Sequence, residues 1–271
     1  MRPGPRLVSP WRSVLWLVTP LFAAVQLALP LGFGVPWLDA TLLSVLLVAL
    51  PGLALAQLAL LGTVRIERIP VYWSSIATLC LVGGASWVVG TRAGGPGAIG
   101  LVVPTPRELV VWSSGLTLAG LVTIVAFREL ATAARIAETP VLRDLLPRDG
   151  RERGVFALLA VAAGLGEELA YRGYALSALA PLLGAPGAAV LTSVVFGILH
   201  GYQGLLGTVR TGVMGGLLAW GFLASGSLWP AIVAHTLIDL VAGIVLGERL
   251  LSTDVSTARK ADPRPSESRD S

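Results

Sequence analysis

Long runs of apolar residues alternate with short polar or Pro- and Gly-rich segments along most of the chain. A helix needs about 20 apolar residues to cross the hydrocarbon core of a bilayer, and several of the runs reach that length. We therefore expect an all-α fold, a polytopic membrane helix bundle of about eight transmembrane helices. The expected spans are residues 13–29, 38–61, 71–90, 108–127, 155–179, 188–200, 205–224 and 228–246.

Pro and Gly residues interrupt these runs. Pro51 predicts a kink in the second span, which neighbouring helices can accommodate. Residues 94–106 predict a loop, and residues 181–186 predict a turn before a short sixth helix. The longest internal polar connection, residues 128–153, is also the most basic one, and we expect residues 131–137 within it to form a helix at the surface.

The composition agrees with a membrane protein. Hydrophobic residues make up 54% of the 271 residues and charged residues 13%, about half of the roughly 25% that soluble domains carry. The single cysteine, Cys80, excludes a disulfide framework and a cysteine-based metal site. The net charge of +4 comes without a basic patch interleaved with aromatic residues, so we expect no nucleic-acid partner.

The positive residues are distributed unequally between alternate connections. With the N-terminus inside, the outside loops carry only Arg92 and Arg107, whereas the inside connections and the tail carry many arginines. Lys and Arg concentrate in cytoplasmic loops. We therefore expect a multi-pass protein of the cell membrane with both termini in the cytoplasm. The preference for arginine over lysine, with abundant Ala, Gly and Leu, is typical of a GC-rich bacterial genome.

Six of the ionisable residues inside the apolar segments of the C-terminal half are candidates for chemistry. A charged residue at the centre of a membrane helix costs roughly 2.5–3.5 kcal/mol, so such residues are usually functional. Both histidines of the chain are among them. We expect these six residues to form one intramembrane active site: Glu167, Glu168, Arg172, His200, His235 and Asp239.

Helical spacing divides these residues between roles. Residues four apart lie on the same face of a helix, which pairs Glu168 with Arg172 and His235 with Asp239. Glu167 points about 100° away from Glu168, because one turn takes 3.6 residues. We expect Glu168 and Arg172 to form a buried structural pair and Glu167 to be the working carboxylate.

Two chemical schemes fit this set, and both hydrolyse an amide or ester inside the membrane. In the first, Glu167 acts as the general base on a water molecule, one histidine assists, and the other histidine with an acid binds the oxyanion. In the second, Glu167, His200, His235 and Asp239 bind zinc, which acidifies its bound water. The partner in either scheme is a peptide or lipopeptide substrate in the lipid bilayer.

Three motifs on successive helices resemble those of the CPBP family, the CAAX proteases and bacteriocin-processing intramembrane proteases, which include the type II CAAX prenyl endopeptidases. The motifs are Glu167-Glu168-x-x-x-Arg172, Phe196-x-x-x-His200 and His235-x-x-x-Asp239. The resemblance implies an all-helical intramembrane endopeptidase of metallo or glutamate type. It also implies roles: Glu167 and His200 activate water, Glu168 and Arg172 support Glu167, and His235 with Asp239 stabilises the oxyanion.

The resemblance also suggests a division of the chain. We expect N-terminal helices and the basic connection in residues 1–150, a CPBP-like catalytic core in residues 151–247, and a disordered cytoplasmic tail in residues 248–271. Asp239 stands where the family often has Asn. An ionised aspartate repels an oxyanion, so Asp239 must be protonated, orient His235 or bind a metal.

Two other functions are compatible with the same residues. A scaffold or bacteriocin self-immunity protein of this fold could keep the polar residues as a structural network. A proton-coupled transporter could use them as a proton relay, although the sequence has no internal repeat of the kind that builds many transporters.

Overall fold

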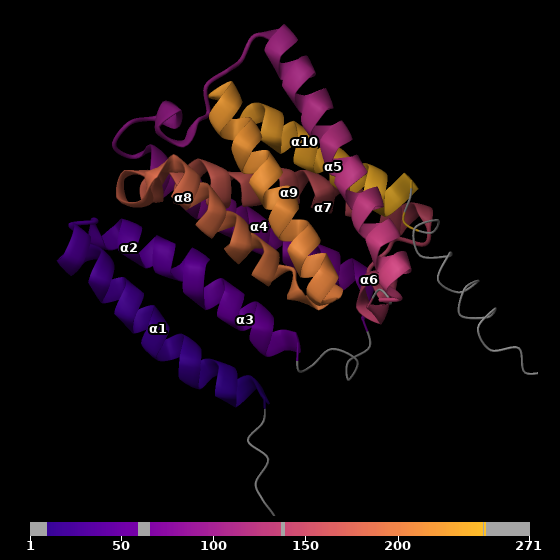
Figure 1. Cartoon of the computed structure of the whole chain (residues 1–271), viewed down its shortest axis with the longest axis horizontal. Helices are drawn as coiled ribbons and strands as arrows, with labels where there is room; N and C mark the ends of the chain where they lie inside the picture. Colours follow the sequence, from indigo (N-terminus) through magenta and orange to yellow (C-terminus); the bar gives the residue numbers. More distant parts are fainter. Residues whose placement is uncertain (1–9, 59–65, 137–138, 246, 248–271) are drawn as a thin grey trace, which may run out of the picture.

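The computed structural model describes residues 10–58, 66–136, 139–245 and 247, and all regular structure in these residues is helical (Figure 1). The elements are α1 (Pro10–Phe33), α2 (Trp37–Ser44), η1 (Val45–Ala49), α3 (Leu50–Gln57), α4 (Arg68–Thr91), η3 (Pro96–Ile99), α5 (Pro106–Ala134), α6 (Pro140–Asp144), α7 (Gly150–Glu167), η4 (Glu168–Leu176), α8 (Ser177–Leu199), η5 (Gly201–Gln203), α9 (Gly204–Ser225), α10 (Trp229–Leu240) and η6 (Val241–Val245). The prediction of an all-α fold is confirmed.

Five helical runs of the described residues are long and apolar enough to cross a membrane: residues 14–33, 37–57, 68–91, 106–134 and 150–199. The last run bends at Gly184, whose φ of 71° breaks the helix inside the turn predicted for residues 181–186. Trp229–Val245 is a shorter apolar helix. A membrane helix bundle is confirmed, whereas the number eight, the orientation of the termini and the division of the chain into three parts stay predictions.

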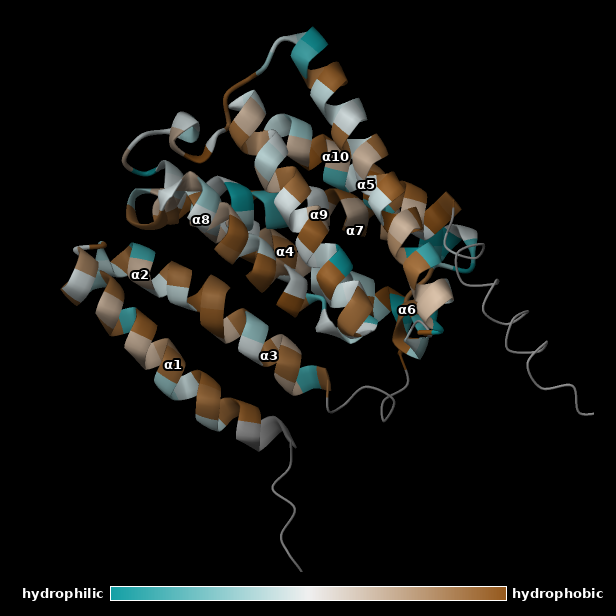
Figure 2. Cartoon of the chain, in the orientation of Figure 1, coloured by the Kyte–Doolittle hydropathy of each residue, from teal (hydrophilic) through white to brown (hydrophobic). Residues whose placement is uncertain are grey.

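The outer faces of the helices are apolar. Leu17 of α1, Leu81 of α4 and Leu205 of α9 expose 74%, 73% and 83% of their surface. Hydrophobic residues occur along the whole length of most helices (Figure 2). Apolar surface on this scale is typical of a protein whose solvent is lipid.

The core of the bundle combines the C-terminal helices with buried residues of the earlier ones, such as Leu29, Leu43 and Val89. α7 packs against α4 and α10, α8 packs against α9, and α5 packs against α9 and α10. α1 and the continuous segment α2–η1–α3 lie side by side at one edge of the bundle, and this segment contacts the rest of the bundle from α3 to α8, from α2 to α4 and from η1 to η4 (Figure 1). The helices that carry the six predicted residues therefore lie in the interior.

Two local expectations have different outcomes. The kink expected at Pro51 stays a prediction, although a π-helical segment, η1, directly precedes α3, the helix in which Pro51 lies. The surface helix expected over residues 131–137 is present only in part, because residues 132–136 are exposed but the helix ends at Ala134. Residues 131–134 are the last turn of α5, which a capping box at Thr105 begins and the left-handed Arg135 (φ 56°) ends. Residues 137–138 and the tail expected over residues 248–271 lie outside the described residues.

Candidate active site

The glutamate pair stands where the backbone changes from an α-helix to a π-helix. Glu167 is the last residue of α7 and Glu168 is the first of η4. Every residue of η4 is buried. π-Helical turns are rare and occur frequently at functional sites, because the widened turn displaces side chains from α-helical positions.

Glycines bring α7 into close contact with its two neighbours. A Cβ on Gly166 would lie 2.6 Å from the Leu79 carbonyl oxygen of α4. A Cβ on Gly164 would overlap the Thr236 hydroxyl of α10. Small residues allow membrane helices to approach this closely. The approach of α7 to α10 places the glutamates of one helix within reach of the histidine of the other.

The predicted Glu168–Arg172 pair is confirmed. Arg172 Nη1 lies 2.8 Å from Glu168 Oε1, and both side chains are completely buried. The guanidinium carbon of Arg172 also lies 4.2 Å from the centre of the Phe196 ring, a cation–π contact. A Cβ on Gly215 would lie 2.8 Å from Arg172 Nη2, so this glycine provides the space that the guanidinium occupies.

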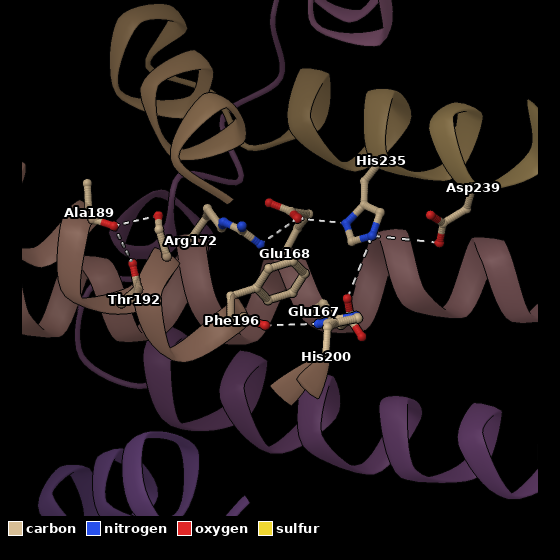
Figure 3. A network of polar contacts seen from close by, with 10 residues as sticks. Glu167, Glu168, Arg172, Ala189, Thr192, Phe196, His200, His235 and Asp239 are labelled. Carbon is tan, nitrogen blue, oxygen red and sulfur yellow. Dashed lines mark hydrogen bonds and ion pairs between the residues drawn. The ribbon is translucent and has the colours of Figure 1, made fainter. Parts of the chain in front are cut away.

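His235 joins this pair from α10 (Figure 3). Its Nδ1 lies 2.8 Å from the same Glu168 Oε1 that binds Arg172. Because Glu168 is the acceptor, Nδ1 carries the proton, and the ring orientation is fixed. Nε2 then faces two other carboxylates, Glu167 Oε2 at 3.6 Å and Asp239 Oδ2 at 3.7 Å. The expected proximity of His235 and Asp239 is confirmed.

His200 ends α8 and is held by its own helix. Its Nδ1 lies 2.9 Å from the Phe196 carbonyl oxygen, which leaves Nε2 available. The Phe196 ring lies between the two histidines, with centroid distances of 4.8 Å to His200 and 6.0 Å to His235. Phe196, the first residue of the second motif, therefore contacts three of the predicted site residues.

A cavity of 880 Å³ adjoins these residues. Glu167, His200, His235 and Asp239 line it together, while Glu168 and Arg172 are fully buried. Most of its other lining residues are apolar and come from α3, α4, α7, α8 and α10. The volume lies in the range of about 300–1,000 Å³ that is typical of ligand sites. The structure thus brings all six predicted residues to one site.

Sequence reasoning missed several polar residues near the site. Tyr202 follows His200 by two residues and lines the cavity. Tyr171 and Tyr174, which had no predicted role, are buried and donate hydrogen bonds to the Leu46 carbonyl and to Asp39. The sequence contained a signal for these bonds: the two tyrosines flank Arg172 in an apolar helix, and their hydroxyl groups also need hydrogen-bond partners there.

The zinc site expected from Glu167, His200, His235 and Asp239 stays a prediction. Among the described residues, no group of three or more His, Cys, Asp or Glu side chains is placed to hold an ion. Nδ1 of His200 and Nδ1 of His235 are both engaged by protein oxygens. These bonds leave the Nε2 atoms of both rings unused by them, and a histidine that binds a metal through one nitrogen usually donates the other to a protein oxygen, so the donor types are compatible with zinc.

Comparison with protein families identifies this region. Residues 151–241 match the family described as type II CAAX prenyl endopeptidase Rce1-like. The chain contains an Rce1-like domain. The domain includes all six site residues and agrees with the resemblance seen in the motifs, whereas α1 to α5 lie outside it. No curated protein and no solved structure matches the chain. Over these residues the chain is similar to the CAAX proteases, and its long apolar helices are those of a multi-pass membrane protein.

Proposed function

We propose that the protein is an intramembrane endopeptidase that hydrolyses a peptide bond near the membrane, with Glu167 and His200 activating the water. The observation that carries this proposal is the buried Arg172–Glu168–His235 chain, which orients His235 Nε2 toward Glu167 at the wall of the cavity. An intramembrane carboxylate without an arginine partner of its own, beside two histidines, suits acid–base chemistry.

The proposed reaction needs only residues of this chain. Glu167 accepts a proton from a water molecule that also hydrogen-bonds to His200 Nε2, and the resulting hydroxide adds to the carbonyl carbon of the peptide bond. The tetrahedral oxyanion accepts a hydrogen bond from His235 Nε2. Glu167 then gives its proton to the leaving nitrogen as the C–N bond breaks, which returns the site to its starting state.

This scheme gives Asp239 a role that avoids the oxyanion. His235 must carry a proton on Nε2 as well as on Nδ1 to serve as the oxyanion donor, so it acts as an imidazolium. Asp239 Oδ2, 3.7 Å from Nε2, stabilises that cation, and Glu168 does the same at Nδ1. Asp239 therefore supports His235, which is compatible with an ionised aspartate at this position.

The substrate that fits best is a peptide or lipopeptide that reaches the site from the bilayer. The lining of the cavity is mostly apolar, which suits an extended segment with hydrophobic side chains or an attached lipid. Zinc bound by Glu167, His200, His235 and Asp239 is the second candidate mechanism, and it requires movement of the side chains toward a common point.

A cleavage assay tests the proposal. Purified protein in detergent is incubated with a quenched lipopeptide library, before and after chelation and zinc re-addition. We expect cleavage by wild type, loss of at least 100-fold in Glu167→Gln and His200→Ala, in line with the usual weight of acid–base groups of about 10²–10⁴, and wild-type rates in Glu129→Gln. Glu129 is an exposed carboxylate on α5 and serves as the matched control.

The outcomes separate the candidates. Indifference to chelation supports the glutamate mechanism, and chelator sensitivity restored by zinc supports the metal mechanism. Folded wild-type protein without cleavage activity would contradict the peptidase and favour a scaffold or self-immunity protein of the same fold.

A further inference from the structure

A second polar cluster, made of the buried Asp39 and Tyr174 and the exposed Arg92, connects the first helices to the site helix. Asp39 of α2 is 9% exposed and lies against Arg92, the residue that follows α4. Arg92 Nη1 lies 3.0 Å from Asp39 Oδ1, and Nη2 contacts Asp39 Oδ2. Tyr174 of η4 donates its hydroxyl to the same carboxylate, with 3.0 Å between the Tyr174 oxygen and Oδ1. Three elements that are distant in sequence therefore meet at one carboxylate.

A second hydrogen bond joins η4 to η1, the π-helical segment that directly follows α2. The Tyr171 hydroxyl of η4 donates to the Leu46 carbonyl of η1 at 3.3 Å. In η1 the Leu50 N–H bonds to the Val45 carbonyl, five residues earlier. In the same register the Leu46 carbonyl needs the N–H of residue 51, which is a proline and has none. Pro51 thus leaves a carbonyl that Tyr171 can satisfy.

These bonds reach the site through its own helix. Tyr171 and Tyr174 lie on either side of Arg172 in η4, and both are 2% exposed. Arg172 in turn holds Glu168 and packs over Phe196. A buried carboxylate in an apolar bundle is costly unless it is fully paired, so Asp39 is expected to have a specific use.

We propose that Asp39 and Arg92, which lie outside the Rce1-like domain, act with Tyr174 of η4 as positioning residues that fix η4, and with it the Glu168–Arg172 pair. The catalytic part of this inference rests on the proposed peptidase function. The structural part does not. In the structural part, the Asp39 carboxylate of α2, held by Arg92 at the end of α4, accepts the Tyr174 hydroxyl and so keeps η4 in place through charge-assisted hydrogen bonds. The Tyr171–Leu46 hydrogen bond is a second support.

Hydrogen–deuterium exchange of the purified full chain tests the structural part. Loss of one buried hydrogen bond is expected to accelerate amide exchange by about fivefold. We expect that acceleration in residues 168–176 of Tyr174→Phe, and a larger one in Asp39→Asn. Tyr72→Phe is the matched control, because it removes a tyrosine-to-carbonyl bond of the same kind, from Tyr72 to Leu145 at 2.6 Å, and is expected to leave η4 exchange unchanged.

Peptide cleavage by the same variants tests the catalytic part. Tyr174→Phe and Asp39→Asn are expected to lower kcat by about tenfold with KM nearly unchanged, because the cavity stays intact while the site residues lose their alignment. Unchanged exchange in residues 168–176 would overturn the inference, and so would faster exchange spread evenly over the chain. Faster exchange confined to residues 168–176 together with an unchanged kcat would also overturn it. An inactive wild type would contradict the proposed peptidase function. The exchange data would then test only the structural part, the claim that Asp39, Arg92 and Tyr174 hold η4 in place.

Discussion

Gly215 and Gly216 are neighbours on α9 that offer a matched pair of substitutions. A Cβ on Gly215 would lie 2.8 Å from Arg172 Nη2 and 3.3 Å from the Ser193 Cα, whereas the nearest atom to a Cβ on Gly216, Ser193 Oγ, is 4.0 Å away. Gly215→Ala therefore presses on the fully buried Arg172, and Gly216→Ala adds a methyl group without a clash. Both changes gain the same helix propensity.

The expected magnitudes follow from these distances. Ala is preferred over Gly in a helix by up to about 1 kcal/mol, which stabilises both variants. Overpacking a buried site costs about 1–3 kcal/mol, which applies to Gly215→Ala alone. We expect its apparent Tm to lie several degrees below that of Gly216→Ala, at about 2–4 °C per kcal/mol for a chain of this size.

The effect on the reaction should be larger than the effect on stability. An ordinary contact needs 3.4 Å or more, so the guanidinium must move by roughly 0.6 Å, which disturbs the bond that holds Glu168 and His235. We expect kcat/KM of Gly215→Ala to fall about tenfold and that of Gly216→Ala to stay within twofold of wild type. Equal Tm and equal kcat/KM in the two variants would refute the role of Gly215 in seating Arg172.

Three further predictions test the packing around the site. Arg172→Met removes the arginine partner of the buried Glu168 and should destabilise the protein by about 3–5 kcal/mol. Adding Glu168→Gln to the same chain should restore part of that stability. An unchanged Tm in Arg172→Met would contradict a stabilising Glu168–Arg172 pair. Gly166→Ala should lower both Tm and activity, because its Cβ meets the Leu79 carbonyl, whereas Gly84→Ala, with open space, should not; equal behaviour would contradict the α4–α7 contact. Thr105→Ala removes the capping box of α5 and should cost about 1 kcal/mol in thermal unfolding with kcat unchanged; a loss of kcat would show that this cap supports the site.

Local spacing predicted the parts of the site that one helix makes by itself. The Glu168–Arg172 bond and the approach of His235 to Asp239 both join residues four apart, and the structure confirms them. The break at Gly184 was predictable for the same reason, because Pro and Gly act on their own segment of backbone. The presence of charged residues in apolar helices then indicated that the Glu168–Arg172 and His235–Asp239 pairs belong to a functional site.

Contacts between helices could not be predicted in the same way. The bond from His235 to Glu168 joins residues 67 positions apart and depends on how closely α7 approaches α10 at Gly164. Asp39 and Tyr174 are 135 positions apart, and neither lies in a motif that spacing rules recognise. The π-helical register of η4 was also missed, because apolar periodicity does not distinguish a turn that is widened by one residue.

Oxygen-isotope labelling tests the central claim most directly. The protein is reconstituted in liposomes in H₂¹⁸O with a lipopeptide library, and the products are identified by mass spectrometry. If Glu167 directs water to a peptide bond, wild type produces new C-termini that carry one ¹⁸O, and Glu167→Gln at the same folded amount produces almost none. The absence of labelled products from folded wild type, or equal labelling by Glu167→Gln, would contradict the assignment of this site as a peptidase centre.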